Sequence, residues 1–179
     1  VNDVANAVMD GADAVMLSGE TSVGIHPDLV IQTMSNIVSK VEEYDDIYNP
    51  AVESIIQPDR FISDHLCDHA VHLAKSVDSK AIATMTHSGY TAFKISSRRP
   101  RAYVYVFTSN RSILNMVNLV WGVKGFYYDD NTSTEKTMED IQKILLEKGY
   151  LDKGDYFLHL VSMPITQEGK TNTVRLSKV

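Results

Sequence analysis

A short segment in the middle of the chain gathers residues that could hold a phosphate group. Residues 86–91 read Thr-His-Ser-Gly-Tyr-Thr and follow an apolar run that predicts a strand. The candidate phosphate-binding residues are Thr86, His87, Ser88, Gly89, Tyr90 and Thr91. Hydroxyl groups, the backbone N–H groups at the start of a helix, and a glycine that permits close approach together suit a phosphate. The alternative is an ordinary strand-to-helix turn that is capped by Ser88.

A second candidate loop covers residues 162–173, between the last two expected strands. Its end carries Gly169, Lys170, Thr171 and Asn172. Lys170 would add a positive charge, and Gly169 would let the loop fold over a ligand. An exposed hairpin loop without a ligand explains the same residues equally well, so both interpretations stay open.

Two other features could suggest chemistry. His65, His69 and His72 form a stripe on one side of a predicted helix, and imidazoles one turn apart can share a metal ion. The pattern shows no second ligating element, so a solvated or interface-edge face is the preferred interpretation and no metal site is predicted. Cys67 is the only cysteine, and we interpret it as a packing residue because no activating partner is evident.

These loops need a scaffold of alternating strands and helices. Strands are expected at residues 80–85, 102–107, 123–128, 155–161 and 173–177, and helices at 64–77, 89–98, 110–119 and 134–148. This alternation predicts an α/β fold: a three-layer α/β/α domain around a mainly parallel, five-stranded sheet. No helix separates the last two strands, so the last strand is expected to be antiparallel and at an edge.

The first 44 residues show a different pattern. We expect a short helix that ends near Gly11, a buried strand at residues 14–17, and an amphipathic helix over 27–44. Ser18, Gly19, Glu20 and Thr21 leave the expected strand at its C-terminal end, where α/β folds place their chemistry. The periodicity then fails over residues 45–63, which predicts a linker.

The segment from Asp3 to Pro27 closely resembles one protein family. Its Asp-Val-Ala-Asn-Ala-Val and Met-Leu-Ser-Gly-Glu-Thr runs are similar to the last βα unit of the (β/α)8 barrel of pyruvate kinases. Residues 86–91 resemble the family's T-x-S-G-x-[ST] effector-phosphate loop, and residues 169–172 resemble the Gly-x-Thr-Asn end of its effector loop. The resemblance implies three parts: a barrel remnant at residues 1–44, a linker at 45–63, and the family's C-terminal allosteric and assembly domain at 64–179.

For the full-length parent, the resemblance implies a cytoplasmic, homotetrameric glycolytic enzyme that transfers a phosphoryl group from phosphoenolpyruvate to ADP with Mg²⁺ and K⁺. It also implies that the catalytic residues and the ligands of both ions precede this chain, which then binds no metal or cofactor itself. Ser18, Gly19, Glu20 and Thr21 would only support the active site.

The resemblance also bears on the effector. Family members that bind fructose 1,6-bisphosphate carry a Trp and an Arg in the segment that matches residues 131–138, and this chain has neither. A sugar monophosphate or AMP is therefore the expected effector. Two alternatives stay open: a free-standing effector-binding module, and an assembly domain that binds no effector.

Composition sets wider limits on function. The formal net charge of −6 over 179 residues argues against generic binding to nucleic acid or to an anionic membrane. No apolar run is long enough to span a membrane. A single cysteine allows no internal disulfide, which fits a reducing cytoplasm. The chain begins with Val1 and not with Met, so its start is expected to be internal.

Overall fold

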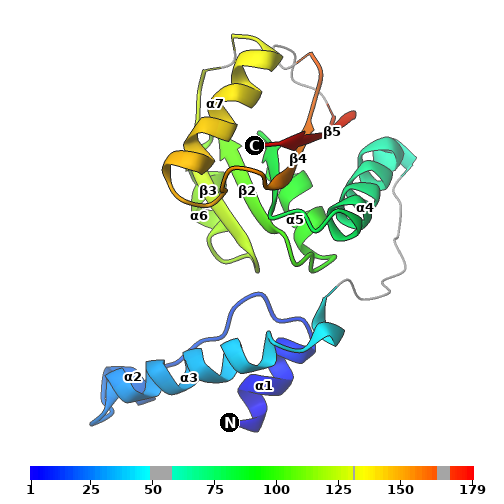
Figure 1. Ribbon diagram of the computed structural model, residues 1–179. Coiled ribbons are helices and arrows are strands. Elements are labelled where there is room, and N and C mark those ends of the chain that lie inside the picture. Colours follow the sequence, from blue (N-terminus) through cyan, green and yellow to red (C-terminus); the bar gives the residue numbers. More distant parts are fainter. Residues whose placement is uncertain (49–57, 131, 165–169) are drawn as a thin grey trace. The chain divides into compact units, whose positions relative to one another are not determined.

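The computed structural model describes residues 1–48, 58–130, 132–164 and 170–179, and divides into two compact units, Val1–Pro50 and Ala51–Val179 (Figure 1). The first unit contains α1 (Asn2–Met9), α2 (Gly19–Ser22), α3 (Pro27–Val41) and the 3₁₀ helix η1 (Asp45–Ile47). The second unit contains η2 (Pro58–Arg60), α4 (Phe61–Ser76), β1 (Ala81–Met85), α5 (Tyr90–Ser96), β2 (Tyr103–Thr108), α6 (Arg111–Val117), β3 (Val123–Tyr127), α7 (Thr134–Glu147), β4 (Tyr156–Val161) and β5 (Thr173–Lys178).

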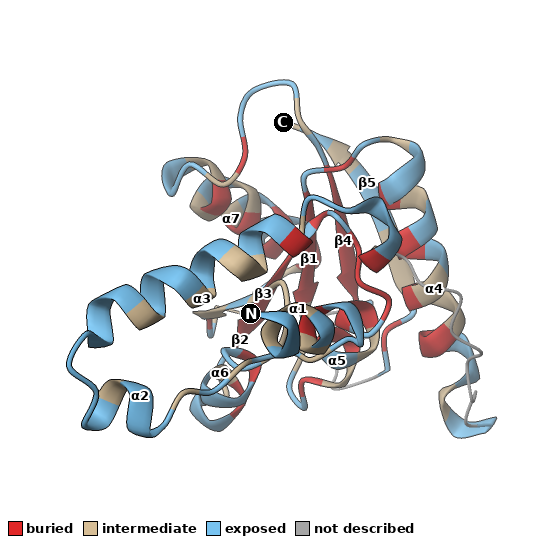
Figure 2. Ribbon diagram, turned by 90° about the horizontal axis from the view of Figure 1, so that it is seen from below, coloured by how far each residue is buried: buried red, intermediate tan, exposed pale blue. Residues whose placement is uncertain are grey.

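The first unit has only a small core. Val8, Val41 and Ile47 are its buried apolar residues, and most of α3 is exposed (Figure 2). The strand predicted at residues 14–17 is wrong: residues 12–17 form neither helix nor strand, and Met16 is 87% exposed. A parallel strand needs hydrogen-bonded neighbours, and residues 1–48 supply no strand that could pair with it.

The second unit is built on the predicted sheet. Its strand order is β3-β2-β1-β4-β5, with β1 parallel to both β2 and β4, and β3 parallel to β2. Strand β5 is antiparallel to β4 and lies at the edge. The predicted fold class, a mainly parallel five-stranded sheet with an antiparallel last strand, is therefore confirmed.

Helices cover both faces of this sheet. Ile82 and Val106 belong to the core on one face with apolar residues of α4, α5 and α6, whereas Ala83 and Phe107 belong to the core on the other face with α7. Neighbouring residues of a strand point to opposite faces, which explains this division. Strands β1 and β4 are almost wholly buried between the layers (Figure 2).

The handedness of the connections explains which helix covers which face. The chain moves outward from β1 to β2 and β3 through α5 and α6, and then returns to β4 on the other side of β1. Because parallel crossovers are right-handed, reversing the direction of travel places α7 on the opposite face. The strand order thus reverses beside β1, at the end of the sheet where both candidate loops begin.

The helix boundaries differ slightly from the sequence-based predictions. Helix α3 ends at Val41, three residues before the predicted end at Tyr44. Helix α4 begins at Phe61, within the predicted linker 45–63. The proposed division at 1–44, 45–63 and 64–179 stays a prediction. In the parts of the chain that the structure describes, no helix has the length and apolar character needed to cross a membrane.

Candidate functional site

The two candidate loops meet at the carboxyl ends of β1 and β4. Residues 86–91 follow β1 and residues 162–172 follow β4, and these two strands are parallel neighbours. The hydroxyl groups of Thr91 and Thr171 share a hydrogen bond of 2.9 Å, and both residues are buried. Of the predicted residues in the second loop, Gly169 lies outside the described residues. Ligands of open α/β sheets bind at this edge, where the strand order reverses.

Hydrogen bonds fix the shape of the first loop. The Gly89 N–H donates to the Thr86 hydroxyl at 3.0 Å, and Asn110 donates from Nδ2 to the carbonyl oxygen of His87 at 3.3 Å. Gly89 has φ +78°, a conformation that disfavours other residues, and a Cβ there would lie only 3.0 Å from the Phe93 ring. Ser88 is exposed at the turn, with the Tyr90 N–H 3.5 Å from its hydroxyl oxygen.

Tyr90 fastens the first loop to the start of α4. Its hydroxyl donates to Asp64 Oδ1 at 2.7 Å, and the Arg60 guanidinium carbon lies 4.1 Å from the centre of its ring. Burial, followed by the hydrogen bond to Asp64, raises the pKa of Tyr90 to about 12. The phenol therefore stays a neutral donor at physiological pH.

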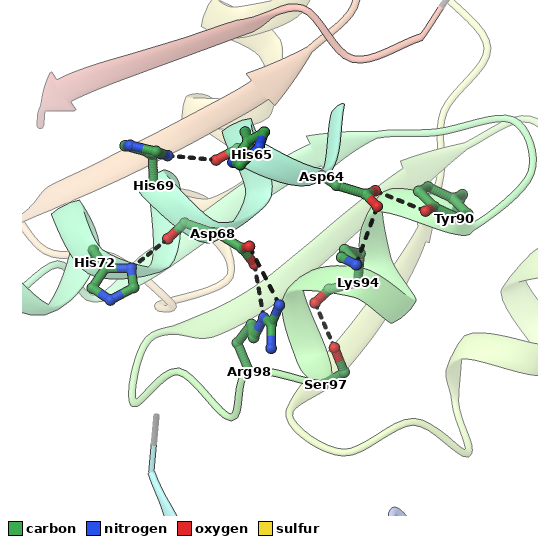
Figure 3. Close-up of polar contacts among 9 residues, drawn as sticks. All are labelled: Asp64, His65, Asp68, His69, His72, Tyr90, Lys94, Ser97 and Arg98. Carbon is green, nitrogen blue, oxygen red and sulfur yellow. Dashed lines mark hydrogen bonds and ion pairs between the residues drawn. The ribbon is translucent and has the colours of Figure 1, made fainter. Parts of the chain in front are cut away.

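Two ion pairs link α4 to α5 and the residues just after it, next to the hydrogen bond between Tyr90 and Asp64 (Figure 3). The fully buried Asp64 faces Lys94 Nζ at 3.2 Å, and Arg98 donates from Nε to Asp68 Oδ1 at 2.7 Å. The acids lie four residues apart on α4, and the bases lie four residues apart on or just after α5. We call these four residues the ion-pair ladder. It ties α5, and with it the preceding loop, to α4.

The second loop is held by its own contacts. Asn172 donates from Nδ2 to the Met163 carbonyl at 2.7 Å and accepts from the Met163 N–H at 2.8 Å. The Ser63 hydroxyl donates to the Thr171 carbonyl at 3.2 Å. Lys170 Nζ donates to the backbone carbonyl of Asp59 and lies 3.5 Å from its carboxylate. The start of α4 and the residues before it therefore contact both loops.

The sequence analysis missed the third component of this site. It assigned Asp59, Arg60 and Ser63 to a linker, whereas these residues touch Lys170, Tyr90 and Thr171. One signal was present in the sequence. Residues 60, 64 and 68 and residues 90, 94 and 98 repeat at four-residue steps with groups that can pair, which is the spacing of neighbours on a helix face.

The histidine stripe makes local backbone contacts. The Nδ1 atoms of His69 and His72 lie 2.7 and 2.8 Å from the carbonyl oxygens of His65 and Asp68 (Figure 3). Within residues 1–48, 58–130, 132–164 and 170–179, no group of three or more His, Cys, Asp or Glu side chains is arranged to hold a metal ion. Cys67 is fully buried, and burial raises the pKa of its thiol to about 12, so it is a packing residue and not a nucleophile.

The four candidate residues of the first unit lie together at α2. The Ser18 N–H donates to Glu20 Oε2 at 3.1 Å, and the Thr21 hydroxyl donates to the Ser18 carbonyl at 3.2 Å. Hydrogen bonds from the backbone N–H groups of Glu20 and Ser18 lower the pKa of the Glu20 carboxyl. Gly19 is the first residue of the helix. These contacts join Ser18, Glu20 and Thr21 in one local turn.

Comparison with known proteins gives matches to both units. The family model described as the alpha/beta domain of pyruvate kinase matches residues 64–177, and the model of the pyruvate kinase barrel domain matches residues 1–31. A pyruvate kinase of Bacillus licheniformis is 35% identical over 99% of this chain and 30% of its own length. One from Lactobacillus delbrueckii subsp. bulgaricus is 32% identical over 98% of this chain and 30% of its own length.

A solved structure supports the same relationship. The crystal structure of a pyruvate kinase from Cryptosporidium parvum matches with a TM-score of 0.82 and 26% identity, over 99% of this chain and 35% of that chain. The chain thus spans about a third of the length of the proteins that it matches.

Proposed function

Because this chain belongs to the pyruvate kinase family, we propose that it is the C-terminal part of an enzyme that transfers a phosphoryl group from phosphoenolpyruvate to ADP. The match at residues 64–177 and the 30% share of its relatives' length support this proposal. In the same proposal the complete enzyme is a cytoplasmic, glycolytic homotetramer, and this chain carries its effector-binding and assembly part.

We assign the transfer step itself to residues outside this chain. Phosphoryl transfer depends on metal ions and cationic groups placed around the phosphoryl oxygens. Among the described residues, no group of three or more His, Cys, Asp or Glu side chains is arranged to hold a metal ion, and in this proposal the ligands of Mg²⁺ and K⁺ belong to the rest of the complete enzyme. Ser18, Gly19, Glu20 and Thr21 would support the active-site end of the barrel.

The site at the carboxyl ends of β1 and β4 is proposed to bind the phosphate of a sugar monophosphate or of AMP. One observation carries this proposal: the buried hydrogen bond between Thr91 and Thr171 joins two loops that each carry groups able to bind a phosphate. The bond of Thr86 to the Gly89 N–H would keep the turn in shape, and the exposed Ser88 would meet the phosphate. Lys170 would supply the opposing charge.

The proposal predicts that residues 1–179 alone form no pyruvate from phosphoenolpyruvate and ADP. The reason is that the groups needed to stabilise the transferring phosphoryl lie outside this chain in the proposed assignment. A coupled assay of pyruvate formation, with the full-length protein as the positive control, measures this. Turnover by the purified chain that depends on both substrates would contradict the assignment.

The proposal also predicts that Ser88→Asp abolishes binding of AMP or a sugar monophosphate to the chain. The added carboxylate would place negative charge where the phosphate is proposed to bind, and like charges at contact distance repel. Isothermal titration calorimetry with the wild type and the variant measures the affinity directly.

Ser76→Asp is the matched control for this experiment. Ser76 is exposed at the last residue of α4, at the opposite end of that helix from the residues that contact the two loops, and its hydroxyl donates only locally to the His72 carbonyl at 2.9 Å. The control adds the same charge and should leave the affinity unchanged. Undiminished binding by Ser88→Asp would mean that the phosphate binds at another site. An equal loss in both variants would mean that the net charge of the chain, and not the position of the added carboxylate, lowers the affinity.

A further inference from the structure

Lys170, the charged residue of the second loop, is already paired with an acid of the same chain. Its ammonium lies 3.5 Å from the carboxylate of Asp59 and also donates to the Asp59 backbone carbonyl. The two side chains are 52% and 66% exposed, so solvent reaches the pair. Asp59 belongs to η2, in the last turn before α4.

The backbone beside Lys170 is held at the candidate site by other contacts. Thr171, the next residue, bonds to the hydroxyl of Thr91 at 2.9 Å, and its carbonyl accepts from Ser63 at 3.2 Å. Lysine carries its charge on a flexible four-carbon stem. The side chain of Lys170 can therefore leave Asp59 and reach a bound anion while its backbone stays in place.

We propose that Asp59 competes with a bound phosphate group for the ammonium of Lys170. Asp59 masks this charge until the phosphate displaces its carboxylate. The inference rests on the proposed function, because it concerns the regulation of the same anion site. A phosphate monoester brings up to two negative charges and several acceptor oxygens, against the single charge of a carboxylate. An exposed ion pair contributes little free energy, so a phosphate can displace it, but the mask still lowers the affinity.

Removing the competing charge should therefore tighten anion binding. In Asp59→Asn, the affinity of the chain for AMP and for inorganic phosphate should rise about two- to fivefold, the range that corresponds to an exposed ion pair. Calorimetric titration of the wild type and the variant under identical salt conditions measures the change, since salt screens exposed charges.

Two controls separate masking from a general change in charge. Asp78→Asn makes the same change at another exposed Asp–Lys pair, where Lys80 Nζ lies 3.3 Å from Asp78, and it should leave the affinity unchanged. The second control repeats Asp59→Asn in a Lys170→Met background. If Asp59 acts through Lys170, its replacement has no effect on binding once the lysine is absent.

Each outcome decides the proposal. A gain in Asp59→Asn that disappears in the Lys170→Met background supports masking, and so does binding detected in Asp59→Asn alone. If the wild type binds and Asp59→Asn does not bind more tightly, masking by Asp59 is refuted but the anion site is not. The same holds if Asp78→Asn tightens binding equally. A gain that persists without Lys170 also refutes masking. If neither the wild type nor Asp59→Asn binds AMP or inorganic phosphate, the proposed masking and the proposed anion site are both refuted.

Discussion

Asp64→Ala is expected to destabilise the second unit by about 3 kcal/mol, the low end of the range for removing one partner of a buried ion pair. Asp64 is fully buried, and it accepts from the Tyr90 hydroxyl and faces Lys94 Nζ at 3.2 Å. The Lys94 side chain is only 16% exposed. The substitution would leave a buried cation and a phenol without their shared acceptor, and such groups are costly to desolvate.

Denaturant unfolding, followed by the fluorescence of Trp121, measures this loss. Trp121 is the only tryptophan of the chain and lies in the second unit, so its signal reports that unit. Asp130→Ala is the matched control, because Asp130 pairs with Lys136 at 2.5 Å where the side chains are 44% and 50% exposed. It should cost at most about 1 kcal/mol. Equal losses in the two variants would mean that burial does not set the strength of the Asp64 contacts.

The backbone amides of residues 14–17 are expected to exchange with solvent roughly a thousandfold faster than those of β1, which is the scale set by a few kcal/mol of difference in local stability. Residues 14–17 form no helix or strand, whereas Ala81–Met85 pairs on both sides within a covered sheet. Exchange from β1 therefore requires the whole second unit to open, and exchange from residues 14–17 does not.

Hydrogen exchange read by mass spectrometry at low protein concentration tests this expectation, since dilution prevents copies of the chain from protecting one another. The amides of α3 serve as an internal reference, because they are hydrogen-bonded within a helix but belong to the first unit with its small core. Equal protection at residues 14–17 and in β1 would show that the first unit is as stable as the second.

The sequence predicts the second unit well because its signals are local. Alternating apolar runs and amphipathic helices give the strands and helices to within a few residues, and the missing helix before β5 correctly gives its antiparallel direction. The strand at 14–17 fails for a different reason. An apolar run of four residues is compatible with a strand, but neighbouring strands supply the hydrogen bonds, and residues 1–48 contain none.

The site shows the same division between local and distant information. Thr86 and Gly89 form the kind of tight turn that their residue types suggest. The contact of Thr91 with Thr171 depends on β1 lying beside β4 in the sheet. The local sequence pattern does not specify the order of the strands. Asp59 was overlooked because a Pro-Asp step usually marks a loop, and its partner Lys170 lies 111 residues further along the chain.

The ion-pair ladder also restricts how the chain length can vary. A residue inserted between Asp64 and Asp68 would turn the rest of α4 by about 100° around its axis, and Asp68 would no longer face Arg98. The same insertion would move Ala70 and Ala74 away from the sheet, where both are buried. In the turn between β3 and α7, the buried Tyr128 donates to Asp140 of α7 at 2.9 Å, whereas Asp129 and Asp130 pair with Tyr127 and Lys136, which are close by in the sequence. Changes in length are therefore expected after Tyr128 and before α7, whereas the spacing within α4 and α5 is fixed.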